Sequence, residues 1–318
     1  MDDIVHISSD FIEASSNFPE LVSEIKGGFA SEDIIIPQRH HHDFPNPQTG
    51  AETTLLLMPA WYPGRISGVK MVTISPENSR FDLPAVQGSY ILMDAVTGKV
   101  RAILEAKSLT TKRTAATSAL ASQYLSKKSA SSLLMIGTGA LSANLIRAHA
   151  SVRPIKNVFV WGRNFLKAKS ICDGLKNEEF NCQPIEAISG KISEVDIVSC
   201  ATLSKTPLVL GRNLKPGQHI DLVGAYRKDM READDEVIQR ASVFVDTFGG
   251  LQESGDIGTP LETGILKENE IKGDLFSLCS EKAGGRTNEE EITVFKSVGH
   301  ALEDLVAASY YFEKLKNE

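Results

Sequence analysis

The sequence predicts an α/β fold in which a doubly wound parallel sheet domain is combined with a strand-rich α+β domain. Three observations indicate this fold. From Ser131 onward, short apolar runs alternate with helical patterns, which is typical of a parallel sheet covered on both faces. Between residues 34 and 104, apolar or alternating stretches are separated by turns that contain Pro and Gly. An Ala-rich helical pattern at 108–125 connects the two regions.

The periodicity of the apolar residues places the individual elements. An amphipathic pattern predicts one helix over residues 10–30. Strands are predicted at 53–58, 67–74, 90–94, 100–105, 133–136, 157–161, 196–201, 219–223 and 243–246. A last helical pattern at 298–316 predicts a helix that packs back on the first region. We therefore expect one domain made of residues 1–114 and 302–318, and a second made of residues 115–301.

The composition is that of an ordinary soluble globular protein. Of the 318 residues, 42% are hydrophobic and 24% are charged. The net charge of -7, from 34 basic and 41 acidic residues without long blocks of either sign, argues against nucleic acid or an anionic membrane as the main partner. The four cysteines are far apart and form no metal-binding spacing, so we expect free thiols. The acidic N-terminal residues do not resemble a signal peptide, and we expect a cytoplasmic protein.

A glycine turn in the middle of the chain indicates a nucleotide site. The apolar run that ends at Ile136 leads directly into Gly137-Thr-Gly139-Ala140-Leu141-Ser142, and a helical pattern follows. Glycines in such a turn let backbone N–H groups approach a pyrophosphate, and the positive end of the following helix faces the anion. Ser142 replaces the third glycine of the motif and is still small enough for close packing. The turn predicts a Rossmann-type dinucleotide-binding domain.

The end of the second strand of this domain determines how the adenosine ribose is recognised. A carboxylate at this point binds the 2′-hydroxyl group of NAD. Here the strand is followed by Gly162-Arg163-Asn164, with no acid before Asp173. A guanidinium favours a 2′-phosphate. The sequence therefore predicts NADPH as the preferred cofactor, with NADH as the alternative.

Three basic residues in or beside the first domain are candidate ligands for an anion. They are Arg39, Lys70 and Arg113. Arg113 is predicted to lie in the first turn of the helix at 108–125, where a cation opposes the helix dipole. A carboxylate or phosphate bound at that helix end would remove the conflict.

Together these motifs make the chain resemble the ornithine cyclodeaminase/mu-crystallin family. The resemblance extends over nearly the whole chain, in the right order, through Pro37-Gln-Arg39, Val69-Lys70, the segment 110–118, Gly137-Thr-Gly139, Val223-Gly-Ala225, Glu253-Ser-Gly-Asp256 and the segment 293–299. It implies a homodimer, with a strand-rich substrate-binding and dimerisation domain beside the Rossmann domain. It also implies redox chemistry on amino acids, imino acids or cyclic imines.

The resemblance assigns roles to individual positions. The residues that would bind the substrate are Arg39, Lys70, Arg113, Ser297 and Val298, the three cations holding its carboxylate. The residues expected at the cofactor are Arg113, Gly137, Gly139, Ala140, Leu141, Ser142, Gly162, Arg163, Asn164, Thr202, Val223 and Gly224. No metal site is expected.

The sequence departs from the family pattern at three positions. Cyclodeaminases and the alanine dehydrogenase branch carry an aspartate after the glycine that follows the fourth Rossmann strand, and Tyr226 occupies that position here. A phenol, with an ordinary pKa near 10, is a poor base at neutral pH, so we assign no catalytic base. Ala85 and Leu141 replace a Ser or Thr and a Gln that many relatives place near the cofactor.

The missing aspartate favours imine reduction, because a protonated imine is already electrophilic. We expect NAD(P)H-dependent reduction of a cyclic ketimine carboxylate, Δ1-pyrroline-2-carboxylate to L-proline, with Δ1-piperideine-2-carboxylate to L-pipecolate as a second reaction. One alternative is an ornithine cyclodeaminase or an alanine dehydrogenase-like oxidoreductase, in which Asp229 supplies the base. The other is a mu-crystallin-like protein that binds NADPH and small ligands without turnover.

Several other polar residues have mainly structural interpretations. His40-His41-His42 is interpreted as a polar loop or strand edge, with one imidazole close enough to Arg39 to face the substrate as the alternative. Glu253 and Asp256 are expected to cap or order a loop, His300 to be structural, and Asp304 to cap or pair within the dimer or the core.

Overall fold

The computed structural model describes residues 4–317, so Met1–Asp3 and Glu318, both assigned to the expected first domain, lie outside it. The chain divides into two compact units, residues 1–113 with 300–318 and residues 114–299. Both units combine helices and strands, and the predicted fold class is confirmed. Among the described residues, the structure contains no helix that is long and apolar enough to cross a membrane.

The first unit is built on a six-stranded sheet with the order β1-β6-β5-β4-β3-β2. Strand β1 pairs in parallel with β6, and the other neighbours are antiparallel. The strands are β1 (Val5–Ile7), β2 (His40–Asn46), β3 (Ala51–Tyr62), β4 (Ile66–Ile74), β5 (Val86–Asp94) and β6 (Val100–Glu105). The helices are α1 (Ser9–Ser15), α2 (Phe18–Ala30), the 3-10 helix η1 (Pro76–Phe81), α9 (Ala301–Lys316) and the start of α3 (Ala106–Leu125).

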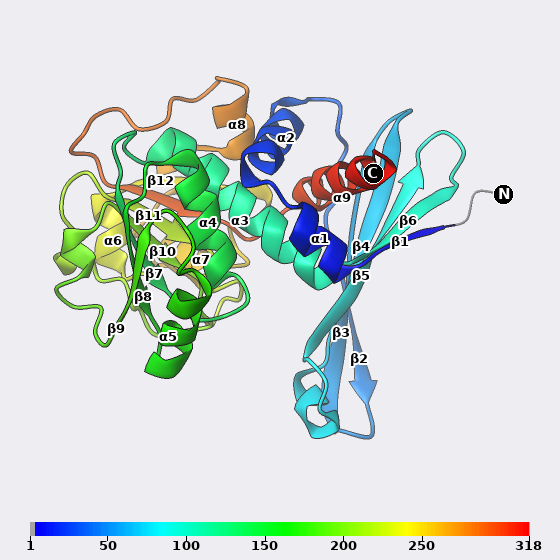
Figure 1. Ribbon diagram of the computed structural model, residues 1–318, viewed down its shortest axis with the longest axis horizontal. Coiled ribbons are helices and arrows are strands. Elements are labelled where there is room, and N and C mark those ends of the chain that lie inside the picture. The colour runs from blue at the N-terminus through cyan, green and yellow to red at the C-terminus, as the bar shows by residue number, and fades with distance from the viewer. Residues whose placement is uncertain (1–3, 318) are drawn as a thin grey trace. The chain divides into compact units, whose positions relative to one another are not determined.

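Helix α9 packs on one face of this sheet, along β3, β4 and β5, and also contacts α2 (Figure 1). The core between them contains Ile12, Leu21, Ile25, Phe29, Leu92, Leu104 and Leu302. Gly28 lets α2 approach α9 closely, because a Cβ atom there would lie 2.7 Å from Val306. The opposite face of the sheet carries partly exposed apolar side chains.

The single helix expected over residues 10–30 is wrong, because α1 and α2 are separate helices. Asn17 starts the second helix: its side chain accepts a hydrogen bond from the Glu20 N–H, and Pro19 occupies the first turn. Ser16, between the helices, bonds back to the carbonyl of Ile12.

The second unit is an all-parallel sheet of eight strands with the order β13-β12-β14-β11-β10-β7-β8-β9. The strands are β7 (Ser132–Ile136), β8 (Asn157–Trp161), β9 (Asn181–Ile185), β10 (Ile197–Cys200), β11 (His219–Leu222), β12 (Ser242–Val245), β13 (Gly273–Asp274) and β14 (Thr293–Lys296). The α-helices are the rest of α3, α4 (Ser142–Val152), α5 (Phe165–Gly174), α6 (Asp235–Arg240), α7 (Gly255–Thr263) and α8 (Leu275–Cys279). Short 3-10 helices are η2 (Ile192–Glu194), η3 (Gly211–Asn213), η4 (Phe248–Gly250) and η5 (Glu268–Glu270).

The strand order reverses between β7 and β10, which is where open parallel sheets bind ligands at their carboxyl ends. Residues that follow β7, β10, β11 and β14 are therefore close together at one edge of the sheet. The sequence patterns did not predict β9, β13 or β14, nor β1 in the first unit, whereas the interpretation of His40-His41-His42 as a polar loop or strand edge agrees with the start of β2 at the edge of its sheet.

Candidate active site

The glycine turn after β7 has the geometry of a pyrophosphate cradle. Gly137 adopts φ +125°, and a Cβ atom there would lie 2.5 Å from the carbonyl oxygen of Ala201, so a larger residue does not fit. Gly139 and Ala140 are exposed, and a Cβ atom on Gly139 would meet nothing within 4 Å. This open backbone, followed by the N-terminal end of α4, fits the phosphates of a dinucleotide.

Ser142 does more than replace a glycine. Its buried hydroxyl donates a hydrogen bond of 2.9 Å to the carbonyl of Gly137, which closes the turn on itself. Leu141, at the N-cap of α4, provides no side-chain cap for the helix. The Ser142 N–H donates a hydrogen bond of 3.2 Å to the Gly139 carbonyl, so the backbone of the turn itself caps part of this helix end.

The loop after β8 presents Arg163 to solvent. Gly162 is packed against Thr138 of the glycine turn, since a Cβ atom there would lie 2.5 Å from the Thr138 methyl group. Asn164 caps α5 by accepting a hydrogen bond from the Lys167 N–H, so its side chain has a structural role. Arg163, between them, is exposed at the carboxyl end of the strand, where the predicted 2′-phosphate contact requires it.

The loop after β11 is held in a fixed, partly strained conformation. Val223 and Gly224 are buried at its start, and Ala225 adopts φ +48°, in the left-handed region. The Ser254 hydroxyl donates a hydrogen bond of 2.6 Å to the Ala225 carbonyl. Tyr226, at the position of the family's aspartate, follows with 43% of its surface exposed.

Asp229, the base that the cyclodeaminase alternative would require, is poorly suited to act as one. Its carboxylate pairs with Lys205 at 3.0 Å and with Arg227 at 3.0 Å. The hydrogen bond from Lys205 lowers the pKa of Asp229, with a further contribution from the charge of Arg227, and this weakens its basicity.

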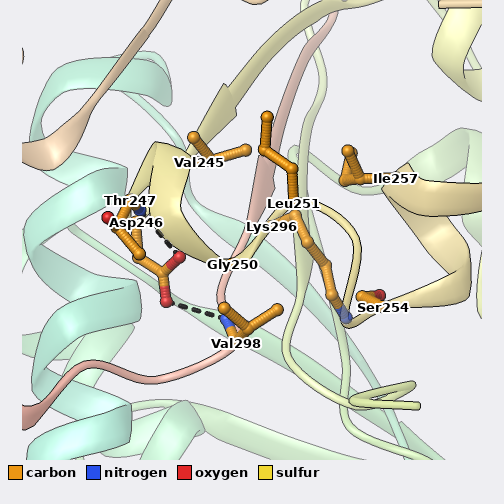
Figure 2. Close-up of a pocket in the computed structure, with 9 residues that line it drawn as sticks. All are labelled: Val245, Asp246, Thr247, Gly250, Leu251, Ser254, Ile257, Lys296 and Val298. Atoms are coloured by element: carbon orange, nitrogen blue, oxygen red, sulfur yellow. Dashed lines mark hydrogen bonds between the residues drawn. The ribbon is translucent and has the colours of Figure 1, made fainter. Parts of the chain in front are cut away.

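Ser297 and Val298 lie in a turn that Asp246 organises. The Asp246 Oδ2 atom accepts hydrogen bonds from the backbone N–H groups of Val298 and Gly299, both at 2.7 Å, and from the Ser297 hydroxyl at 3.1 Å. Figure 2 shows the carboxylate of Asp246 directed at Val298, in a small pocket whose other side is formed by the Lys296 side chain. Asp246 therefore fixes the backbone of two predicted site residues.

Asp256 orders the neighbouring loop, although not by capping alone. Its Oδ1 atom accepts hydrogen bonds from the backbone N–H groups of Glu232 and Ala233, at 2.7 and 3.1 Å. Its Oδ2 atom pairs with Lys296 at 3.1 Å, and both side chains are buried. Thr202 donates to the carboxylate of Glu232 from the same edge of the sheet.

In the first unit, Lys70 and Arg113 are brought together by two buried acids of α9. Asp304 lies 2.7 Å from Lys70 Nζ and 3.0 Å from Arg113 Nε, and Glu303 lies 2.5 Å from the Arg113 Nη1 atom. The four side chains are at most 6% exposed. Two positive and two negative groups therefore form one buried, formally neutral cluster.

Burial and charge act in opposite directions within this cluster. Burial lowers the pKa of Lys70 to about 8, although Asp304 favours the charged form, and Arg113 adds to the lowering. Burial would raise the pKa of Asp304, but Arg113 and Lys70 hold it below its usual value. Lys70 can therefore change its protonation state near physiological pH, whereas Asp304 stays ionised.

Tyr90 completes the cluster on the neighbouring strand. It pairs directly with Lys70 across β4 and β5, and its side chain is fully buried. The Tyr90 hydroxyl has no hydrogen-bond partner among the described residues. This hydroxyl occupies the space that a side chain at position 68 would need, because a Cβ atom on Gly68 would lie 2.3 Å from the hydroxyl oxygen. Burial and Asp304 raise the pKa of Tyr90 well above its ordinary value, so the phenol stays protonated.

The position of Arg113 in its helix corrects one argument from the sequence. Helix α3 begins at Ala106, because the Glu105 carboxylate accepts hydrogen bonds from the N–H groups of Lys107 and Ser108. Arg113 is therefore two turns inside the helix. The expected conflict with the helix dipole at the first turn is wrong, and the partners of Arg113 are the acids of α9.

The remaining candidates lie at the edge of the sheet or on loops. Arg39 is partly exposed just before β2, which is two strands away from β4. The three histidines 40–42 form the start of β2, the exposed edge strand, and the described residues contain no group of three or more His, Cys, Asp or Glu able to hold a metal ion. Ala85 is exposed before β5, and the His300 ring stacks on Phe29.

Three positioning acids were not predicted from the sequence as parts of the site. They are Glu232, Asp246 and Glu303. The one available signal is the position of Asp246, the last residue of the strand predicted at 243–246, because the carboxyl ends of parallel strands carry functional groups.

Comparisons with known proteins agree with this architecture. Residues 8–318 match the model of the ornithine cyclodeaminase/mu-crystallin family. An uncharacterised protein of Schizosaccharomyces pombe is 43% identical over 96% of each chain, and a Delta(1)-pyrroline-2-carboxylate reductase of Colwellia psychrerythraea is 37% identical over 97% of this chain and 98% of its own.

Among solved structures, the Delta(1)-pyrroline-2-carboxylate reductase of Thermococcus litoralis, in complex with NADH and L-proline, has a TM-score of 0.91. It is 29% identical, and the match covers 99% of this chain and 98% of that one. The resemblance stated from the sequence motifs is therefore confirmed, and the chain belongs to the ornithine cyclodeaminase/mu-crystallin family.

Proposed function

We propose that this protein uses a reduced nicotinamide cofactor to reduce a cyclic ketimine carboxylate, Δ1-pyrroline-2-carboxylate to L-proline, with Δ1-piperideine-2-carboxylate to L-pipecolate as a second reaction. The observation that carries the proposal is the loop after β11, which presents Tyr226 where cyclodeaminases of the family have an aspartate. The names of the Colwellia and Thermococcus relatives support it.

The cofactor would bind at the carboxyl edge of the parallel sheet. The turn from Gly137 to Ser142 would hold the pyrophosphate, and Thr202, Val223 and Gly224 would contact the cofactor from the ends of β10 and β11. When bound, the nicotinamide supplies the hydride. Arg163 would select NADPH over NADH. Tyr226 would favour imine reduction over deamination, because it replaces the carboxylate base that cyclodeaminases have in the loop after β11.

Lys70 and Arg113 would hold the substrate carboxylate, with Arg39 as the third cation. Because Glu303 and Asp304 already balance the charges of Lys70 and Arg113, a ligand that adds a lone negative charge would be disfavoured. A protonated imine with a carboxylate has no net charge and matches this cluster. A clamp of this kind fixes the reacting carbon, which lowers the barrier by positioning.

The deciding experiment is NAD(P)H oxidation with both imines, with ornithine and alanine assayed in parallel. Turnover of an imine above the rate without enzyme, and its loss in Arg113→Lys, is the expected result, because lysine keeps the charge but not the two-pronged contact with Glu303 and Asp304. Far-UV circular dichroism checks that the variant is folded. Ammonia release from ornithine would instead favour a cyclodeaminase, and tight NADPH binding without any turnover would favour a binding protein.

Cofactor preference forms a separate part of the proposal, and it depends on Arg163. We expect a higher kcat/KM with NADPH than with NADH, and Arg163→Ala should reduce the NADPH value about tenfold or more while changing the NADH value little. Lys169→Ala, an exposed cation on α5, is the matched control. Equal use of both cofactors that Arg163→Ala leaves unchanged would refute the preference.

We also propose a homodimer that forms through the face of the first unit's sheet opposite Lys70. This face carries the apolar side chains of Leu55, Leu57, Trp61, Val69, Met71, Ile91, Met93 and Ile103, all partly or largely exposed in the single chain. Light scattering should give the mass of a dimer, and Met71→Glu should shift it toward the monomer. Val96→Glu, on an exposed loop, should not. The cytoplasmic location expected from the sequence stays a prediction.

A further inference from the structure

Glu232 is a fully buried acid whose carboxylate is committed to Thr202. It lies in the segment before α6, and its Oε1 atom accepts hydrogen bonds from the Thr202 backbone N–H at 2.6 Å and from the Thr202 hydroxyl at 2.9 Å. The Thr202 oxygen in turn accepts a hydrogen bond from the Ser204 N–H. With its proton directed at Glu232, the Thr202 hydroxyl can offer its remaining lone pair to a donor on a ligand.

Thr202 is also confined by two glycines on the neighbouring strand ends. A Cβ atom on Gly224 would lie 2.0 Å from the Thr202 carbonyl oxygen and 2.5 Å from Glu232 Oε1. A Cβ atom on Gly137, the first glycine of the turn, would lie 3.4 Å from the Thr202 methyl group. Thr202 therefore occupies the point where the ends of β7, β10 and β11 meet.

Glu232 is itself held by the ion pair at the next strands. Asp256 accepts hydrogen bonds from the backbone N–H of Glu232 and binds Lys296, and the Lys296 ammonium donates to the Gly224 carbonyl. This connects the end of β14 and the start of α7 to the Thr202 contact. The Glu232 backbone bonds to Asp256, Leu208 and Val209, whereas its carboxylate accepts the two hydrogen bonds of Thr202 and interacts with the Cys200 thiol. A side-chain change at Glu232 therefore acts most directly on Thr202 and Cys200.

The carboxyl group of Glu232 is in an environment that brings its titration near neutrality. Burial raises the pKa of Glu232 to about 7, with Lys296 opposing and Asp256 adding to the effect. The Cys200 thiol on β10 also interacts with it and lowers the pKa, and burial keeps the pKa of that thiol well above its ordinary value. The Oε2 atom of Glu232 accepts no hydrogen bond from the described residues.

We propose that Glu232 is a positioning residue for the cofactor: it holds Thr202 in place at the carboxyl edge of the parallel sheet and thereby sets how tightly the nicotinamide cofactor binds. This inference rests on the cofactor assignment of the proposed function. Ionised Glu232 accepts stronger hydrogen bonds than the neutral acid, so Thr202 is held most firmly above neutral pH. Cofactor affinity should follow.

The test is NADH binding, measured by fluorescence titration at pH 6.0 and 8.5 without any imine. NADH is the probe because it lacks a 2′-phosphate that titrates in this range. We expect the wild type to bind several-fold more tightly at pH 8.5, Glu232→Ala to bind about tenfold more weakly at both values, and Glu232→Gln to bind with little pH dependence. Glu236→Gln, an exposed acid on α6, should match the wild type.

Unfolding by urea provides a readout that does not depend on the cofactor. A folded-state pKa raised from 4.5 to about 7 gives a stability contribution that is complete below pH 4.5 and is lost as pH rises through 7. In Glu232→Gln the free energy of unfolding should not show this decrease with pH. The same urea titrations also show whether each Glu232 variant is folded, so that weak NADH binding is not confused with a failure to fold.

Two results would overturn the proposal: NADH affinity of Glu232→Ala equal to that of the wild type, or a pH dependence that persists unchanged in Glu232→Gln. Failure of the wild type to bind NADH would overturn it together with the cofactor assignment. If NADH binds as expected but no imine is reduced, the proposed reaction fails and the role of Glu232 stands.

Discussion

Replacing Asp304 with Asn removes a buried carboxylate that contacts both Lys70 and Arg113. Arg113 keeps Glu303 at 2.5 Å, whereas the ammonium of Lys70 loses its partner at 2.7 Å. Breaking a buried ion pair from one side typically reduces stability by about 3–5 kcal/mol. We expect a loss of this size in the free energy of unfolding at pH 6, where Lys70 is charged.

The loss should shrink as the pH rises through 8. In the wild type the pKa of Lys70 is lowered to about 8, below its unfolded value of 10.5, so between these values the unfolded chain holds a proton that the native state has released. Stability from this group therefore rises with pH across that window. At pH 9 Lys70 is mostly neutral, and Asp304→Asn removes less attraction.

Urea unfolding of both proteins at pH 6 and pH 9 measures the effect. Glu313→Gln, an exposed acid on the same helix that pairs with Lys316, is the control and should change stability by less than about 0.5 kcal/mol. The charge-free double variant Lys70→Met with Asp304→Leu should lose less than the single variant. A loss below about 1 kcal/mol at pH 6, or one that is equal at both pH values, would refute the reasoning.

Three further predictions concern other contacts of the described residues. Asp246→Ala leaves the three hydrogen-bond donors of the turn 297–299 without their acceptor, so the free energy of unfolding in urea should fall by about 2–3 kcal/mol. An unchanged urea midpoint would contradict this prediction. The Sγ atoms of Cys172 and Cys182 lie 2.9 Å apart, so oxidised glutathione should convert these two thiols to a disulfide. The thiols give up two protons and two electrons, and one oxidised glutathione becomes two reduced glutathione molecules. Peptide mass spectrometry should find the linked pair, and its absence after full oxidation would count against the geometry. Asn17→Ala removes the cap of α2 and should lower stability by about 1 kcal/mol, which a thermal melt at neutral pH detects.

The parts of the fold that could be predicted are those whose signal is local. An apolar strand followed at once by Gly137 and Gly139 identifies β7 and its turn, because the glycine requirement lies within a few residues. Strand β14 was missed for the opposite reason. It contains Lys296, which a periodic pattern treats as exposed. Lys296 can be buried because Asp256, on another element, balances its charge and the Gly224 carbonyl accepts a hydrogen bond from its ammonium group.

The candidate site shows the same distinction. Lys70 and Arg113 were found through the resemblance to the family. Their partner Glu303 and the role of Glu232 depend on contacts between residues far apart in the chain, for which a single sequence holds no signal. Asp304 was expected to pair, but its partners could not be named until α9 was placed on the sheet.

The packing of the Tyr90 phenol over Gly68 has a consequence for how this family can vary. The two positions are diagonal neighbours on β4 and β5, because Tyr90 pairs with Lys70 and Gly68 pairs with Leu92, and the phenol occupies the volume in which any side chain at position 68 would begin. A mutation at either position alone therefore leaves a clash or a void beside Lys70, whereas a paired exchange can be tolerated. Related sequences with a residue larger than glycine at this point are expected to lack the tyrosine, so the two positions should change together in evolution.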